Sequence, residues 1–242
     1  MQRYFSEVKK DNLFLLKDED LYHIKTVMRM NINDEIEVVY EQKVYICKLD
    51  KNYNAIIEKV IEDNKIKKIN YVLCVPILQE QKMSFILQKA TELGVDLIIP
   101  ILTARSMVKV KDKENKKIER WKRICKEASE QSKRVTIPEV SEIKKITDLN
   151  LDGLKIVCST KEKDNTLKKV LKNNLKCDKI IMVVGPEGGL TLDEENKLID
   201  LGFIPTSLGD NILRVETAPL YLLSVLNYEM EWLLWILLLI IF

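Results

Sequence analysis

Apolar runs that alternate with a helical pattern constrain the fold of this chain more than any other feature of its sequence. Residues 71–78 and 95–102 are nearly continuous apolar runs, and residues 82–94 between them repeat apolar side chains at helical spacing. Residues 155–159 and 179–185 are further short apolar runs rich in β-branched side chains. Strands that are apolar on both faces are typical of a parallel sheet covered by helices. We therefore predict an α/β domain with a parallel sheet for most of the chain.

The N-terminal part follows a different pattern. Apolar and polar residues alternate in residues 36–40, again after a turn at residues 41–42, and in residues 54–62. This period of two is typical of half-buried antiparallel strands. We predict a small β-rich domain over residues 1–68, the α/β domain over residues 69–232, and an apolar tail of unknown role over residues 233–242.

The ionisable residues exclude several classes of enzyme. The chain has 39 Lys and Arg residues against 37 Asp and Glu residues, so its net charge of +2 indicates no strong overall attraction to nucleic acid. Its one histidine, His23, argues against Ser-His-Asp catalysis, Cys-His catalysis and polyhistidine metal sites. The five cysteines lie far apart without a CxxC pair, as free thiols do in a reducing cytoplasm. We expect no metal and no disulfide.

Neither end of the chain resembles a targeting signal. Residues 1–11 are charged from the third residue onward and lack the apolar centre of a signal peptide. Residues 232–242 are all apolar, but as a helix they would reach only about 16 Å, roughly half of a bilayer core. We expect a cytoplasmic protein without a membrane span. The tail is either a dimer-packing extension or an aberrant end.

Charge is segregated along the chain. Residues 109–123 hold eight basic and three acidic residues, a net charge of +5, whereas residues 185–242 hold two basic and nine acidic residues, a net charge of −7. The basic run is either a solvated helix face or a patch that contacts an RNA backbone.

The sharpest local motif is GPEGGLTLDEE, residues 185–195. Three glycines and a proline within five residues make a tight loop whose main chain can approach a ligand. Thr191 and Glu194 have the spacing of a capping box, which predicts that a helix begins there. The loop follows an apolar strand, and open α/β sheets bind ligands at that end of their strands. It matches neither the P-loop nor the GxGxxG pattern, and a sharp turn without a ligand is the alternative.

Two further stretches carry polar residues on apolar frameworks. In residues 208–229, Arg214 and Glu216 stand just before an apolar helix, where they form either an ion pair or part of a site. The stretches 87–106 and 120–134 carry polar residues that together suggest one lined groove: Lys89, Glu92, Arg105, Glu127, Gln131 and Arg134.

These motifs identify a family. The chain contains GPEGGLTxxE, LGxxILRxETA, KATELGVxxIxP and EAxEQSxR, and it opens with MQRYF and, at residues 23–29, HIKTVMR. It closely resembles the bacterial family that methylates ring nitrogen N3 of a uridine in small-subunit ribosomal RNA, within the SPOUT superfamily of AdoMet-dependent RNA methyltransferases. The resemblance covers roughly residues 1–230.

The resemblance implies an N-terminal PUA-like β-barrel that binds RNA and a C-terminal α/β domain with a deep trefoil knot, an exception to the rule that chains are unknotted. It also implies a homodimer with S-adenosyl-L-methionine (AdoMet) bound at each knot, and small-subunit ribosomal RNA or the assembled subunit as the partner.

The resemblance further implies roles for individual residues. Arg214 stabilises the uracil anion, and Glu216 either orients Arg214 or accepts the proton; we favour orientation, because an ion-paired carboxylate is a weak base. His23 is a less favoured base. The residues expected to bind the cofactor are Thr160, Gly185, Pro186, Glu187, Gly188, Gly189, Leu208, Gly209, Ile212 and Leu213. Those expected to bind RNA are Arg3, Arg29, Lys89, Arg105, Gln131 and Arg134.

The chain departs from the family at a few positions. Asn211 stands where the family commonly has an arginine, Asn33 stands where a glycine is usual, and the apolar tail has no counterpart. Two alternatives therefore stay open: ribose 2′-O-methylation by an enzyme of the same superfamily, and a non-catalytic protein that binds RNA or the ribosome.

Overall fold

The chain divides into two compact units. The computed structural model describes residues 1–61, 69–106, 114–174 and 177–241, with side chains up to Glu229. The N-terminal unit consists of residues 1–66 and 126–137, and the C-terminal unit consists of residues 67–125 and 138–242. The grouping of residues 126–137 with the N-terminal unit has no signal in the sequence, because these residues lie within the stretch predicted to be α/β.

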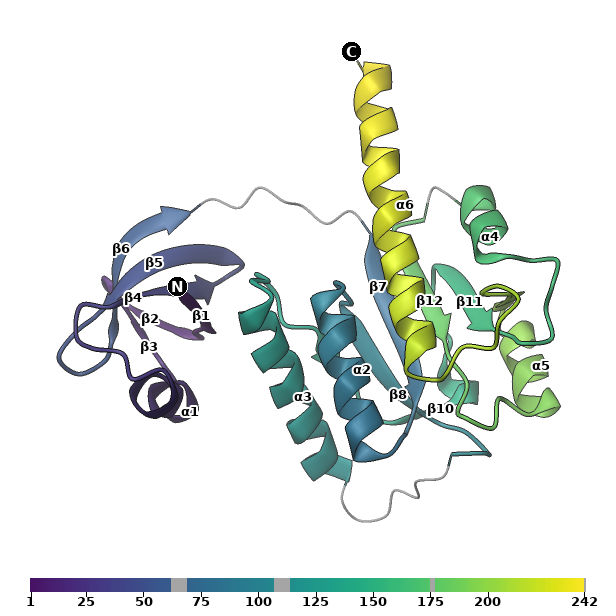
Figure 1. Cartoon of the computed structure of the whole chain (residues 1–242), viewed down its shortest axis with the longest axis horizontal. Coiled ribbons are helices and arrows are strands. Elements are labelled where there is room, and N and C mark those ends of the chain that lie inside the picture. The colour runs from purple at the N-terminus through teal and green to yellow at the C-terminus, as the bar shows by residue number, and fades with distance from the viewer. Residues whose placement is uncertain (62–68, 107–113, 175–176, 242) are drawn as a thin grey trace. The chain divides into compact units, whose positions relative to one another are not determined.

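The N-terminal unit is built on one six-stranded sheet (Figure 1). Its strand order is β1-β4-β5-β6-β3-β2, in which β1 pairs with β4 in parallel and the other pairs are antiparallel. The strands are β1 (Gln2–Phe5), β2 (Val8–Lys10), β3 (Leu13–Leu15), β4 (Glu35–Tyr40), β5 (Lys43–Leu49) and β6 (Ala55–Ile61). The predicted β-rich unit is therefore confirmed.

Left-handed residues make the turns of this sheet. Glu41 and Gln42, between β4 and β5, have φ values of 49° and 60°, which match the twist that a two-residue hairpin requires. Asn33 has φ 70°, as expected where it replaces a glycine. Helix α1 (Asp18–Tyr22) continues into a π-helix, η1 (His23–Val27).

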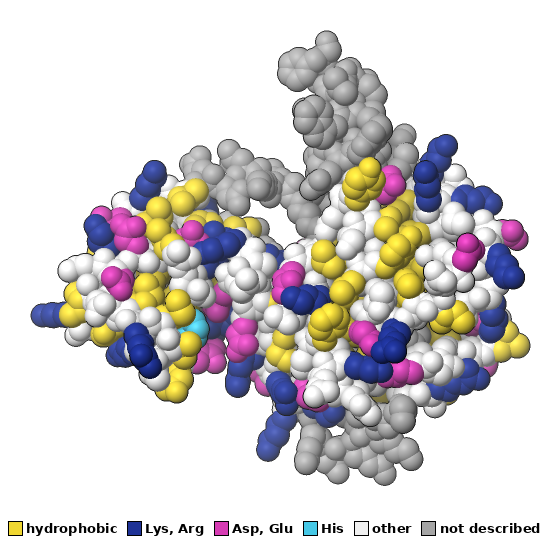
Figure 2. All heavy atoms as spheres, viewed as in Figure 1, with side chains coloured by type: hydrophobic (Ala, Val, Ile, Leu, Met, Phe, Trp, Pro, Cys, Tyr) yellow, Lys and Arg dark blue, Asp and Glu magenta, His cyan; other side chains and the backbone are white. Residues whose placement is uncertain are grey.

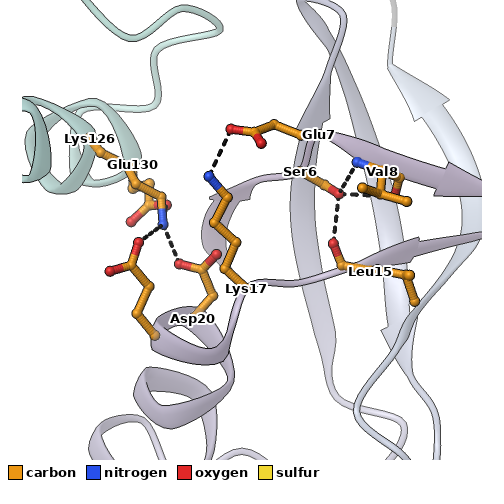
Figure 3. Close-up of polar contacts among 9 residues, drawn as sticks. Ser6, Glu7, Val8, Leu15, Lys17, Asp20, Lys126 and Glu130 are labelled. Atoms are coloured by element: carbon orange, nitrogen blue, oxygen red, sulfur yellow. Dashed lines mark hydrogen bonds and ion pairs between the residues drawn. The ribbon is translucent and has the colours of Figure 1, made fainter.

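A buried polar cluster holds residues 126–137 in this unit. The Lys126 ammonium lies 2.5 Å from Asp20 Oδ1, 3.4 Å from Glu19 Oε1 and 3.6 Å from Glu130 Oε1 (Figure 3). The side chains of Asp20 and Glu130 are almost fully buried. Burial, reinforced by the charge of Asp20 and opposed by that of Lys126, raises the pKa of Glu130 to about 7.

The C-terminal unit contains a seven-stranded sheet whose pairs are all parallel. Its order is β10-β8-β7-β12-β11-β13, with β9 also paired to β8. The strands are β7 (Asn70–Pro76), β8 (Leu97–Leu102), β9 (Glu139–Val140), β10 (Lys144–Lys145), β11 (Leu154–Cys158), β12 (Lys179–Val183) and β13 (Ile204–Thr206). The predicted parallel sheet is therefore confirmed.

Helices cover both faces of this sheet. One face packs on α2 (Glu80–Glu92), on the part of α3 (Glu114–Gln131) before Lys126, on α4 (Leu167–Asn173) and on α6 (Thr217–Ile241). The other face packs on α5 (Leu192–Asp200) and the short 3₁₀ helix η2 (Ile146–Asp148). Helices α2 and α6 lie side by side (Figure 1). This two-sided covering explains why the strands are apolar on both faces.

Some predictions fall on residues outside the described part of the chain. The end of the predicted N-terminal domain lies within residues 62–68, and the start of the basic run lies within residues 107–113. The apolar tail continues α6 to Ile241. In the described part of the chain, no helix has the length and apolarity needed to cross a bilayer.

Candidate active site

The C-terminal unit contains a cavity of about 580 Å³ at one end of its parallel strands. Three loops surround it: the segment after β11, the glycine loop of residues 184–190 after β12, and the segment of residues 207–216 before α6. The lining includes all ten predicted cofactor residues, together with Arg105, Arg214 and Glu216. The fold thus brings together three motifs that are far apart in sequence, at the edge where open α/β sheets bind ligands.

The glycine loop is held by the helix that follows it. Thr191 caps α5 by accepting a hydrogen bond from the Glu194 amide at 3.2 Å, and Glu194 accepts one from the Thr191 amide at 2.8 Å. The other carboxylate oxygen of Glu194 accepts a 2.6 Å hydrogen bond from the Ala104 amide. The predicted capping box is therefore confirmed, and it also fastens the segment after β8 to the loop.

The glycines of the cavity leave open space beside the main chain. Gly189 has φ 70° and Gly209 has φ 125°, and a Cβ at either position would meet no atom within 4 Å. Both adopt backbone conformations that favour glycine. A Cβ at Gly188 would instead lie 3.3 Å from Arg105 Cδ.

Apolar side chains line the segment before α6. Leu208 and Leu213 pack partly against the main core, whereas the Ile212 side chain is 82% exposed. Covering such an exposed isoleucine with a ligand or another chain lowers the free energy, because apolar surface is removed from water.

A lysine that the sequence did not single out joins two acidic residues of the site. Lys82, on α2, places its ammonium 2.8 Å from Glu187 Oε1 and 3.9 Å from Glu216 Oε2. The hydrogen bond from Lys82 lowers the pKa of Glu187, and the same bond raises the pKa of Lys82. Glu216 Oε2 is buried and accepts no hydrogen bond from the described residues. Glu216 therefore faces Lys82, not Arg214 as expected, and no ion pair between Glu216 and Arg214 occurs among the described residues.

A second lysine–carboxylate pair also lines the cavity. Glu195 accepts a 2.7 Å hydrogen bond from Lys161 and another from the Ser159 hydroxyl. Burial favours the neutral acid, but these hydrogen bonds prevail and lower the pKa of Glu195. Sequence reasoning missed this pair, because Ser159 and Lys161 follow β11 without any recognisable motif.

Comparison with known proteins identifies the family. A profile described as an RNA methyltransferase domain matches residues 65–227, and one described as an RNA methyltransferase PUA domain matches residues 16–67. The ribosomal RNA small subunit methyltransferase E of Bacillus subtilis (strain 168) is 34% identical over 96% of this chain and 98% of its own length. This chain belongs to the ribosomal RNA small subunit methyltransferase E family. The resemblance found in the sequence is confirmed.

Solved structures extend this likeness to the fold of the methyltransferase E family. A methyltransferase of Legionella pneumophila, solved with bound cofactor SAM, has a TM-score of 0.86 and 27% identity, covering 94% of this chain and 97% of that one. The ribosomal RNA small subunit methyltransferase E of Neisseria gonorrhoeae, bound to S-adenosyl methionine, has a TM-score of 0.81 and 28% identity with the same coverage. The predicted fold class, a PUA-like domain with a SPOUT methyltransferase domain, is confirmed. The trefoil knot stays a prediction.

The residues expected to bind RNA in this methyltransferase E family member fall in both units. In the C-terminal unit, Lys89 donates a 2.8 Å hydrogen bond to Glu92, and Arg105 donates one to Gly188 O at 2.7 Å. In the N-terminal unit, Arg29 is exposed with φ 52°, and Gln131 is exposed at the end of α3. Their roles stay predictions.

Arg134 and Arg3 are occupied within the N-terminal unit. Arg134 donates hydrogen bonds to the carbonyl and hydroxyl oxygens of Thr136, each at 3.2 Å. Arg3 is only 8% exposed; it pairs with Glu37 at 2.9 Å and donates to the carbonyl oxygens of Lys133 and Arg134. This burial argues against the RNA contact predicted for Arg3, whose guanidinium instead ties β1 to β4 and to the segment after α3.

His23 is not part of the cavity, and the described residues form no metal-binding group. His23 belongs to the N-terminal unit, where its Nδ1 lies 3.0 Å from the Tyr4 hydroxyl, and it does not line the cavity. Across the residues that the structure describes, no group of three or more His, Cys, Asp or Glu side chains is arranged to hold a metal ion.

Proposed function

We propose that this chain transfers a methyl group from AdoMet to N3 of a specific uridine in small-subunit ribosomal RNA, in the bacterial cytoplasm. One observation carries the proposal: a single cavity at the strand ends gathers the glycine loop, the segment before α6 and Arg214. Relatives of the methyltransferase E family, which match over nearly the whole chain, are solved with this cofactor bound.

The residues around the cavity suit AdoMet. Its volume of about 580 Å³ lies within the roughly 300–1,000 Å³ of small-molecule sites. The main chain at Gly189 and Gly209 leaves space for a ligand to approach, and the apolar side chains of Leu208, Ile212 and Leu213 provide a surface for the adenine face. The remaining residues proposed to hold the cofactor are Thr160, Gly185, Pro186, Glu187 and Gly188.

Arg214 is the proposed catalytic residue. Bound AdoMet supplies an electrophilic methyl group, so the protein has to position the uridine and favour loss of its N3 proton. The uracil anion spreads its charge over the two carbonyl oxygens beside N3, and a guanidinium placed against one of them stabilises that charge. Arg214 is exposed at the cavity, and no hydrogen bond or ion pair holds its guanidinium within the described residues.

Glu216 acts as a charged neighbour and not as the base. Its carboxylate faces the Lys82 ammonium at 3.9 Å and is engaged in that ion pair. The imide proton is released to solvent, and Arg214 stabilises the uracil anion that this release creates.

The substrate is held by basic and polar side chains. We propose that Arg29, Lys89, Arg105, Gln131 and Arg134 contact phosphates or bases of the ribosomal RNA, since such contacts fix the register of an RNA on a protein. Binding through these groups weakens steeply with salt.

The active form is proposed to be a homodimer of knotted subunits. Hydrophobic side chains gather on the surface of the C-terminal unit over α6 and α2 (Figure 2). Phe85 on α2 and Tyr221 and Tyr228 on α6 are all exposed, and Tyr228 is 66% exposed. An apolar surface of this kind supports contact with a second copy.

A labelling experiment tests the proposed function. The purified protein is incubated with AdoMet carrying a labelled methyl group and either protein-free small-subunit RNA or assembled small subunits. We expect label in the RNA of at least one substrate. Absence of label from both, in a protein that remains folded, would contradict the proposal.

A further inference from the structure

Lys82 connects three segments that are distant in sequence. It lies in the first turn of α2, and its ammonium contacts Glu187 of the glycine loop at 2.8 Å and faces Glu216 at 3.9 Å. All three residues line the cavity. No motif of the sequence assigned a role to this lysine.

Two carboxylates, Glu187 and Glu216, and one guanidinium, Arg214, line the cavity together with Lys82. Glu216 Oε2 is buried and receives no hydrogen bond from the described residues, although the side chain as a whole is 21% exposed; an oxygen withdrawn from water in this way is stabilised by an opposing charge. Lys82 supplies that charge. The positive charge of Arg214, which lies only two positions from Glu216, acts to lower the pKa of Lys82. The Arg214 guanidinium nevertheless forms no ion pair with the described residues.

We propose that Lys82 is a positioning residue of the methyl-transfer site, an inference that rests on the proposed function. Its ammonium neutralises Glu187 and Glu216, and it thereby keeps Glu216 from capturing the Arg214 guanidinium. Arg214 then remains available for the uracil anion. Without Lys82, Arg214 is the neighbouring cation that pairs with Glu216, and the substrate loses its positive partner.

Substitution of Lys82 separates this role from simple packing. Lys82→Met should lower kcat at saturating RNA by about tenfold or more, because Arg214 is diverted from the transition state. The Kd for AdoMet, measured by calorimetry, should change by less than about threefold, because the predicted apolar contacts of the cofactor remain. Lys82→Arg, which keeps the cation, should retain kcat to within about threefold.

Lys197→Met is the matched control. Lys197 also pairs with a carboxylate, Asp193 at 2.6 Å, but it lies on α5 and does not line the cavity. Its substitution should leave kcat and AdoMet affinity unchanged.

A double-mutant cycle tests whether Lys82 acts through Glu216. In a Glu216→Gln background the carboxylate no longer competes for Arg214, so Lys82→Met should then lower kcat by less than about twofold. An equal loss in both backgrounds, or a Lys82→Met enzyme as active as the wild type, would overturn the role of Lys82. A wild-type protein that binds no AdoMet and methylates no RNA would instead refute the proposed function itself.

Discussion

Arg105 Nη1 donates a 2.7 Å hydrogen bond to the carbonyl oxygen of Gly188. The neighbouring Ala104 amide donates to Glu194, so two consecutive residues after β8 fasten the glycine loop and the start of α5. Arg105 was expected to contact RNA. In the structure its side chain lines the cavity and, in addition, holds the glycine loop through Gly188.

Substitution of Gly188 should weaken cofactor binding. A Cβ at this position lies 3.3 Å from Arg105 Cδ, so the branched side chain of Gly188→Val pushes Arg105 away and strains its hydrogen bond to the loop. We expect the Kd for AdoMet, measured by calorimetry, to rise by about tenfold, the loss of roughly one charged hydrogen bond. Gly202→Ala is the control, because Gly202 is also a glycine of a tight turn, with a left-handed φ of 86°, but it does not line the cavity. An unchanged Kd in Gly188→Val would contradict this role of the loop.

Arg214→Ala should separate catalysis from cofactor binding. Removal of one group that stabilises developing negative charge typically lowers kcat by about 10²–10³-fold. AdoMet affinity should stay within about threefold of the wild-type value, because no contact with the cofactor is assigned to the guanidinium. Single-turnover methylation and calorimetry measure the two effects. Loss of AdoMet binding would show that Arg214 belongs to the cofactor pocket.

Local patterns predicted residues that line the cavity because each lining segment is contiguous in the sequence. The strand, the glycine loop and the capping box of Thr191 and Glu194 are contiguous, and parallel strands bring their ends to one edge of a sheet. Lys82 escaped prediction because a lysine at helical spacing is ordinarily a solvated residue. Its partners, Glu187 and Glu216, follow more than 100 positions later in the sequence.

The buried charges of the N-terminal unit escaped prediction for a similar reason. Arg3 pairs with Glu37 because β1 and β4 are adjacent and in parallel register, which no alternation of apolar residues reveals. Lys126 and Glu130 belong to a helix whose earlier part packs in the other unit.

Glu130 should make the stability of the protein depend on pH. Burial raises its pKa from the ordinary value of 4.5 to about 7, so the folded state holds a proton that the unfolded state has already released. This contribution is complete below about pH 4.5 and is lost as the pH rises through about 7. We therefore expect the free energy of unfolding in urea of Glu130→Gln, relative to that of the wild type, to rise by about 2 kcal/mol from pH 5 to pH 8. The exposed Glu142→Gln should show no such gain, and a flat difference for Glu130→Gln would refute the assignment.

Loss of Lys126 should destabilise the N-terminal unit. Lys126→Met leaves Asp20 and Glu130 as buried acids without their cation, and breaking such a buried pair costs about 3 kcal/mol or more. The free energy of unfolding in urea measures this loss. Lys122→Met, on the same helix, removes only an exposed pair with Glu119 and should change it by less than about 1 kcal/mol. Equal effects of the two substitutions would mean that the buried cluster does not stabilise the unit.

Identification of the methylated nucleoside tests the central claim most directly. Small-subunit ribosomal RNA treated with the protein and AdoMet is digested to nucleosides and analysed by mass spectrometry. The account predicts uridine methylated on N3 of the base, at one position and only in the presence of the protein. A methyl group on a ribose, or no methylated nucleoside at all, would contradict it.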